Sequence, residues 1–418
     1  MSRLKNSNWR IREFVVLAFG MLSFTCAFSQ NLTETEAINT ALQNNLMIKS
    51  AEYEVEHFKQ LKKTGSELGR FSAVWMKGQY NTIEKDNNLT LTQTIPFPGT
   101  IGANLKLGEE HIIGADKNLL VTKNNLVYQV KSTYERLLYQ HAVQLLLLAQ
   151  DSLFTDFARA SAIRYKTGES NLLEMTTADT QLQEIKNAIR ISEADIFMSQ
   201  KQLQVILKSD VPVDAANNIG KRILSNDSLS SSLDSNPQIQ FANQQIKINQ
   251  QLKRVENNKL FPDFSFGYFN QTLIGYQNTT GTDVFYDKSN RFNGFTAGIQ
   301  IPLWFAPQVA RAKAASYMEE SSRQSAEYVR LSVYGEYEQA LRELDKNQAS
   351  LTYYETSALK NADLILDQAR KAYRSGEIGY VEYLQSLRNA INIKSNYLQA
   401  LHQYNLSVIR IEFLTGKY

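Results

Sequence analysis

The chain has few cysteines, histidines and prolines, and each shortage excludes a class of protein. Its single cysteine, Cys26, lies in the N-terminal segment, so residues beyond 29 can form neither disulfides nor thiolate metal sites. The four histidines, His57, His111, His141 and His402, never stand three or four residues apart, which argues against a metal site. Phosphate-binding glycine loops and nucleophile elbows are missing too. We therefore expect no enzyme, no cofactor and no bound metal ion.

Long apolar runs are also missing, except at the N-terminus. Four basic residues precede an apolar run from Phe14 to Phe28, and Ala27, Phe28 and Ser29 suit cleavage before Gln30. This pattern predicts a secretory signal peptide at 1–29. The run has about 15 residues against the ~20 of a spanning helix, so a membrane anchor is the weaker alternative. A lipid attached to Cys26 is a further alternative. Past residue 29 only β-strands are left to cross a membrane.

Charge of one sign is not in excess. The sequence holds 45 basic and 42 acidic residues, and removal of 1–29 takes away four of the former and one of the latter. The remaining charges balance, which argues against a nucleic-acid partner.

Proline placement divides the chain. The seven prolines leave two proline-free stretches of more than 110 residues, between Pro98 and Pro212 and after Pro307. Because proline breaks helix interiors, long helices can form there. Apolar residues in these stretches recur at steps of three and four, as in coiled coils. The stripes are Val130, Tyr134, Leu137, His141 and Leu145; Ala178, Leu182, Ile185 and Ile189; and Tyr397, Leu401, Tyr404, Val408 and Ile411.

Two short segments between these helical stretches repeat each other. Residues 164–170 read RYKTGES, and residues 372–378, 208 positions further on, read AYRSGEI. Gly168 and Gly376 can take the positive φ at which many helices end, so each segment predicts a turn between two helices. At the same offset Tyr165, Glu169, Glu174, Ile185 and Lys186 match Tyr373, Glu377, Glu382, Ile393 and Lys394. These matches favour an internal duplication.

The prolines at the other end of the helices bracket a second repeated element. NNLTLTQTIPFPGT (87–100) corresponds to NGFTAGIQIPLWFA (293–306), and apolar residues alternate with polar or small ones in both. Such patterns predict strands with one apolar face. Residues 71–80 and 261–270 are candidate partner strands, the second through Phe264, Phe266 and Tyr268. We expect polar loops at 81–88 and 277–290.

Each half of the chain thus reads as helix, β-hairpin, long helix, turn and long helix. We expect a first repeat at 30–209 with a hairpin at 71–96 and helices at 103–208, a linker at 210–235, and a second repeat at 236–418 with a hairpin at 262–302 and helices at 307–415. Four strands with apolar faces leave two unpaired edges. The chain's own helices could cover such a sheet, or three copies could close it into a barrel of twelve strands.

This plan resembles the TolC-like outer membrane efflux proteins and looks closest to the CusC/CzcC type that serves heavy-metal and drug exporters. The likeness rests on QTIPFPGT (93–100), the two Y-x-x-G-E turns and Leu173-Glu174, and it covers about residues 32–415. It implies a mainly helical chain with a pair of β-hairpins. Its long coiled-coil-like helical hairpins would form a trimeric α-barrel in the periplasm, and its four strands would join a 12-stranded β-barrel in the cell outer membrane.

The resemblance also assigns roles to the two turns, as periplasmic tips of the tunnel. It implies adaptor docking by Tyr165, Lys166, Gly168 and Glu169 and by Tyr373, Arg374, Gly376 and Glu377. Glu174 and Glu382, each six residues after a turn glycine, match positions where the family places acids at the pore aperture. The helix dipole alone would also favour a glutamate there. Some family members carry a gating arginine where this chain has Ile378.

The expected function is a passive export duct of a tripartite efflux system, for metal ions or small toxic compounds. The expected partners are two further copies, a periplasmic adaptor (membrane fusion) protein, an inner-membrane pump of RND type and outer membrane lipid. The alternatives are the outer membrane component of a type I protein secretion system and a soluble periplasmic coiled-coil scaffold. Trp75 and Trp304 stand near strand ends, either as interfacial aromatics or as core residues. Met76, Met175 and Met198 are too scattered to form a methionine ladder for soft metals.

Overall fold

The computed structural model describes residues 30–224, 233–278 and 281–417, and the expected signal peptide with Cys26 lies outside them. The chain forms two compact units, one from residues up to 39 and 133–219, the other from 40–132 and 220–418. Helices α2 (Glu34–Asn44) and α4 (Pro98–Lys166) run from one unit into the other. The first unit draws on the expected first repeat and the linker, whereas the second contains residues of both repeats. The division into repeats stays a prediction.

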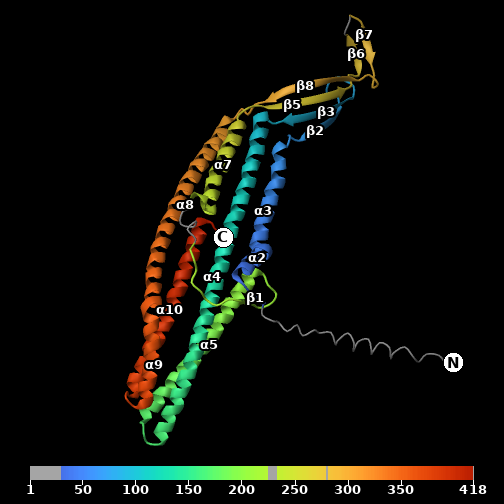
Figure 1. The fold of residues 1–418 in the computed structure, drawn as a ribbon. Helices are drawn as coiled ribbons and strands as arrows, with labels where there is room; N and C mark the ends of the chain where they lie inside the picture. The colour runs from blue at the N-terminus through green and yellow to red at the C-terminus, as the bar shows by residue number, and fades with distance from the viewer. Residues whose placement is uncertain (1–29, 225–232, 279–280, 418) are drawn as a thin grey trace, which may run out of the picture. The chain divides into compact units, whose positions relative to one another are not determined.

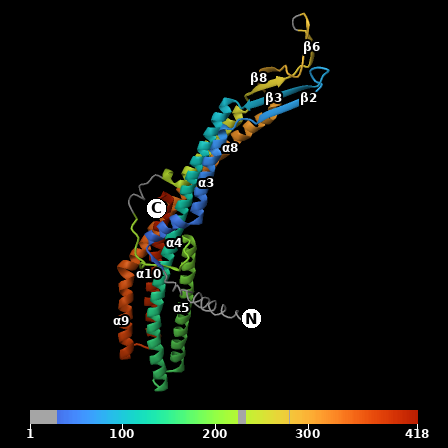
Figure 2. The same cartoon turned by 90° about the vertical axis from the view of Figure 1, so that its right-hand side faces the viewer.

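In the first unit, the C-terminal part of α4 and helix α5 (Leu172–Leu207) lie side by side (Figures 1 and 2). The expected stripe on α5 is buried at Ala178, Leu182 and Ile185, and burial continues through Ile196, Leu203 and Leu207. On α4, Val130, Tyr134 and Leu137 are buried as expected, but Leu145 is 64% exposed. The periodicity therefore predicts the packed face well, except at its far end on α4.

Two short parallel strands, which were not predicted from the sequence, hold the first described residues in place. Strand β1 (Gln30–Leu32) pairs with β4 (Val213–Ala215), and the Tyr134 hydroxyl donates to the Leu32 carbonyl at 2.9 Å. Beside it His141 Nε2 lies 2.7 Å from Asp214 Oδ1. Burial raises the pKa of Asp214, but hydrogen bonds from His141 and the Ala215 N–H outweigh it and hold this pKa below its usual range. The carboxylate form is thus favoured in the folded unit.

The second unit contains a four-stranded antiparallel sheet with the order β2 (Phe71–Gly78), β3 (Asp86–Ile95), β5 (Asp263–Gln271) and β8 (Phe292–Gln300). The register brings most of the apolar residues to one face: Phe71, Ala73, Trp75, Leu89, Leu91, Ile95, Phe264, Phe266, Tyr268, Phe295, Ala297 and Ile299. The other face carries mainly Ser72, Thr90, Thr92, Thr94, Ser265, Gly267, Thr296, Gly298 and Gln300, together with the apolar Val74, Met76 and Phe269. Phe295 is 87% exposed and Trp75 65%, so the chain's own helices do not cover the apolar face.

Each strand of this sheet continues into or from a helix at the same end (Figure 1). Helix α3 (Leu46–Lys62) leads through the short η1 (Lys63–Ser66) to β2, β3 leads to α4, α7 (Pro237–Asn258) leads to β5, and β8 leads to α8 (Phe305–Tyr353). The helices keep the order of the strands. Lys62 of α3 pairs with Glu109 of α4 at 2.9 Å, Gln244 of α7 donates to Glu110 at 2.7 Å, and Lys253 pairs with Glu319 of α8 at 3.1 Å.

The polar loop expected at 277–290 is wrong in part, because the segment after β5 forms a further hairpin. Strands β6 (Gly275–Asn278) and β7 (Asp283–Tyr286) pair antiparallel, and Tyr276 and Phe285 contact edge to face at 5.2 Å between ring centroids. Asp86 ties this segment to β3, since its carboxylate accepts from Ile274 N–H at 2.8 Å and Thr272 Oγ1 at 3.1 Å. Because β6 and β7 have only four residues each, their alternation of apolar and polar residues is too short to predict strands.

The remaining helices of the second unit pack around α10 (Tyr380–Thr415), which follows α9 (Leu359–Ser375); a short η2 (Leu233–Ser235) precedes α7. Buried Asn347 of α8 donates to Ser407 at 2.7 Å, and Lys394 of α10 pairs with Asp363 of α9 at 2.7 Å. Between α8 and α9 the chain makes one π turn, η3 (Tyr354–Ala358). Such turns mark places where a helix holds one residue more than its regular pattern allows.

The long helical hairpins end in the same backbone motif. After α5, the N–H of Ser209, which follows Lys208, donates to the Gln204 carbonyl. After α10, the N–H of Lys417, which follows Gly416, donates to the Glu412 carbonyl. Both residues are left-handed, Lys208 with φ +50 and Gly416 with φ +69. The two are 208 positions apart, the offset of the turn glycines. Lys208 is the one described residue other than glycine with positive φ.

We expect Lys208→Gly to stabilise the protein by about 1 kcal/mol, because glycine takes a left-handed conformation without the steric penalty of a side chain. Lys186→Gly, at an exposed position inside α5, should destabilise it by a similar amount. Thermal unfolding of the two purified variants, followed by circular dichroism, measures both effects. Changes in the same direction would contradict this account of Lys208.

Candidate functional site

The two turns named by the sequence share one backbone geometry. Gly168 has φ +80 and Gly376 has φ +76. In the first turn Glu169 N–H donates to Arg164 O at 2.8 Å, and in the second Glu377 N–H donates to Ala372 O at 2.9 Å. Each glycine N–H reaches the carbonyl three residues back, that of Tyr165 or Tyr373. Both are Schellman motifs, which is why the same short sequence occurs twice.

The side chains expected to dock an adaptor lie at these turns. Tyr165, Lys166, Gly168 and Glu169 are exposed in the first turn, as are Arg374, Gly376 and Glu377 in the second. Tyr373 is half-buried, because its ring stacks on that of Tyr383 at 4.5 Å and 10°. Each turn thus presents one acidic and one basic side chain on a glycine-containing loop. Tyr383, which supports the second turn alone, could not be predicted from the repeated segments.

Glu174 is held within the first turn. It is 4% exposed, its Oε2 accepts from Ser170 Oγ at 2.5 Å, and its Oε1 lies 3.3 Å from Arg164 Nη1. Its own N–H donates to Asn171 Oδ1 at 2.9 Å, so Asn171 caps α5. The sequence patterns assigned no role to Arg164, although it begins the quoted segment 164–170, or to Asn171, although an asparagine three residues before a glutamate is a helix-start signal.

Glu382 differs from Glu174 in its surroundings. It is exposed, and its Oε2 accepts from Gly379 N–H at 3.2 Å, so it closes a capping box at the start of α10. The two glutamates therefore match in sequence and backbone position but not in environment. Glu174 holds its turn together, whereas Glu382 leaves its carboxylate accessible.

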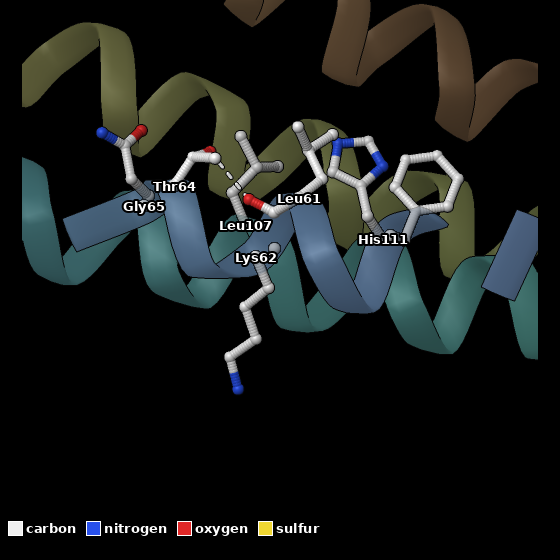
Figure 3. Close-up of a pocket in the computed structure, with 9 residues that line it drawn as sticks. Leu61, Lys62, Thr64, Gly65, Leu107 and His111 are labelled. Carbon is white, nitrogen blue, oxygen red and sulfur yellow. Dashed lines mark hydrogen bonds between the residues drawn. The ribbon is translucent and has the colours of Figure 1, made fainter. Parts of the chain in front are cut away.

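A groove between α3 and α4 opens elsewhere in the second unit (Figure 3). It has a volume of about 270 Å³ and is lined by Leu61, Leu107 and the stacked rings of Phe58 and His111, whose centroids are 5.0 Å apart. Burial lowers the pKa of His111, so the stacked ring is neutral at pH 7. A side chain at Gly108 would meet Lys62 at 2.9 Å, which explains why the helices approach closely here.

The described residues contain neither a cluster of metal-ligating side chains nor a helix that could span a membrane. Within 30–224, 233–278 and 281–417, no three His, Cys, Asp or Glu side chains gather in a way that could hold a metal ion. In the same ranges none of the helices combines the length and apolar character needed to cross a membrane.

We expect Glu174→Gln to loosen the first turn by about 1 kcal/mol, because Arg164 loses the charge on its buried partner. Glu382→Gln should change the second turn by less than about 0.5 kcal/mol, since glutamine also completes a capping box. Amide hydrogen exchange of residues 164–174 and 372–382 measures both. Equal loosening of the two turns would contradict the different roles given to the two glutamates.

Comparisons with known proteins agree with these features. Residues 228–417 match the family described as outer membrane efflux protein. No curated protein sequence matches the chain. Solved structures with the same fold include a membrane protein from Pseudomonas aeruginosa, at 14% identity over 94% of this chain and 92% of that chain, with a TM-score of 0.77.

Two further structures extend the likeness. CusC is 17% identical over 100% of this chain and 96% of that chain, with a TM-score of 0.73. The outer membrane protein VceC from Vibrio cholerae is 15% identical over 92% and 96%, with a TM-score of 0.74. The resemblance inferred from the turns and from QTIPFPGT is thereby confirmed. The chain therefore has the fold of these outer membrane channel structures, and its residues 228–417 match the outer membrane efflux protein family.

Proposed function

We propose that three copies of the chain form the outer membrane duct of a tripartite efflux system. The observation that carries this proposal is the two-faced sheet with β2 and β8 as its edges. An edge strand presents unpaired N–H and C=O groups, which hydrocarbon cannot satisfy. Pairing β8 of one copy with β2 of the next satisfies them and gives twelve strands from three chains. The match of residues 228–417 to the outer membrane efflux protein family supports the same assembly.

Closure of the sheet gives each face a surrounding that suits it. The apolar face, with Phe295 and Trp75 exposed, would contact lipid, and the face of serine, threonine and glycine would line the pore. The helices α3, α4, α7 and α8 would continue the wall in the same order as the strands. The duct supplies no energy of its own, so transport through it depends on a partner pump.

The partners we propose are a periplasmic adaptor and an RND-type inner-membrane pump, with metal ions or small toxic compounds as cargo. The adaptor would dock on the two turns, whose exposed charged residues and rigid backbone suit a protein contact. Glu382 is the better candidate for an aperture carboxylate, because its charge is accessible while that of Glu174 is paired with Arg164. Three Glu382 side chains around a narrow opening would attract cations.

The assembly is tested by mass. We expect the purified protein to be a trimer in detergent, because the apolar face and both strand edges of a lone chain have no partner. Light scattering or native mass spectrometry of the detergent complex measures the stoichiometry. A folded monomer with full strand content would overturn the proposed duct.

The docking role of the turns is tested by substitution. We expect Gly376→Val to reduce adaptor cross-linking and export, because valine strongly disfavours φ +76. The trimer should still form, since the sheet is unaffected. Gly335→Val is the matched control, as Gly335 lies inside α8 with no atom within 4 Å of its added Cβ. Normal cross-linking and export in Gly376→Val would show that the turn does not dock the adaptor.

A further inference from the structure

We propose that a basic hollow between α4 and α7 binds the phosphate group of an anionic phospholipid. The hollow has a volume of about 390 Å³ and lies one to three turns from the sheet. It is lined by the basic residues Lys106 and Arg254 and by the polar residues Gln251, Asn257 and Asn258. Its floor is made of Gly99, Gly102 and Ala103. Cationic and amide donors around a small-residue floor are the chemistry that a phosphate diester fits.

The charges at the hollow leave a net positive site. Lys106 Nζ lies 3.1 Å from Glu109 Oε2 and 3.6 Å from Glu110 Oε1, so acidic residues partly neutralise it. Glu109 also pairs with Lys62 at 2.9 Å and therefore serves two cations. Arg254 is exposed and makes no ion pair with any described residue. The guanidinium is the group best placed to meet an added anion.

One amide that lines the hollow, that of Asn258, is held in position by a hydrogen bond. Asn258 Nδ2 donates to the Gly99 carbonyl at 2.7 Å, which joins the end of α7 to the start of α4. A Cβ added at Gly99 would meet the Phe97 ring at 2.5 Å. By contrast, a Cβ added at Gly102, which also lines the hollow, would meet nothing within 4 Å. The backbone at Gly99 is therefore tightly packed, whereas the space next to Gly102 is open.

The hollow lies on the side of the wall that continues the apolar face of the sheet. In β3 the residues on the apolar face point their backbone N–H and C=O groups toward β5. Asn87, which is in step with these residues along the strand, shows this direction, because its carbonyl accepts from Thr272 N–H at 3.0 Å. With α7 on the β5 side of α4, the right-handed turn of the helix sends Gly99, Gly102 and Lys106 to the flank below this apolar face. Asn104 and Leu107 fall on the opposite flank. The basic hollow thus comes directly after the lipid-facing surface.

The apolar sheet face and the basic hollow follow one another in the same order as the hydrocarbon and phosphate layers of a membrane leaflet. Hydrocarbon would contact the apolar strands, and the phosphates would lie at the level where the strands end and the helices begin. Trp304 and Leu303, which are 83% and 86% exposed, stand at the same strand–helix boundary. Basic residues beside a membrane-embedded surface favour anionic headgroups. The inference rests on the proposed function in one respect, since it takes the apolar face to contact lipid.

The test measures how many lipids the purified full-length protein retains in neutral detergent, by native mass spectrometry with phosphatidylglycerol or phosphatidylcholine added. We expect the unaltered protein to retain phosphatidylglycerol preferentially. Arg254→Gln should weaken this retention about fivefold, the effect of one cation near an anionic surface. Gly102→Leu should weaken it as much by filling the hollow while every charge remains. Arg342→Gln, at an exposed position of α8 far along the helix from the sheet, is the charge-matched control and should change nothing.

Three results would overturn the proposal. They are equal retention of the two lipids, unchanged retention in both Arg254→Gln and Gly102→Leu, and displacement of phosphatidylglycerol by millimolar inorganic phosphate, which would make the hollow a site for soluble anions. All three variants should remain trimers and conduct ions in neutral-lipid bilayers. A variant that loses lipid preference but still conducts ions therefore supports the role of the hollow. Loss of the trimer would instead contradict the proposed duct.

Discussion

The structure of the second unit depends on the register of four antiparallel strands. Because side chains alternate along a strand, a slip of one residue at any of the three pairings would send apolar side chains to the polar face. The pairing of Leu91 with Tyr268 and of Tyr268 with Phe295 avoids this and builds one continuous apolar surface. The same pairings set the order of the helices that follow each strand. Register thus determines both the lipid-compatible face and the arrangement of the wall below it.

The long helices, the turns and the strands of the large sheet could be predicted from the sequence because their patterns are long and locally coded. Proline-free stretches with steps of three and four gave α4, α5 and α10, and period-two alternation gave β3 and β8. The short strands β1, β4, β6 and β7 could not be predicted. A three- or four-residue pairing is fixed by contacts such as Tyr134 to Leu32 or Asp86 to Ile274, and these are remote in sequence.

The candidate site shows the same limit. Gly168 and Gly376 were predictable because a left-handed helix end selects glycine over most residues. The environments of Glu174 and Glu382 were not, since both positions read alike and differ only in what surrounds them. Arg164 at the end of α4 pairs with Glu174, whereas Ala372 occupies the matching position in the second turn. The first residue of each quoted segment, arginine in one and alanine in the other, thereby gives two equivalent carboxylates different partners.

The π turn η3 has a consequence for symmetry. Pro96 and Pro302 are 206 positions apart, whereas Gly168 and Gly376 are 208 apart, so the second half holds two more residues between strand end and turn. The wider turn at Tyr354–Ala358 takes up part of this excess and shifts the helical phase of everything after it. In the proposed trimer the two helical hairpins of each chain would therefore differ in length and helical phase, and a partner protein would meet two kinds of site.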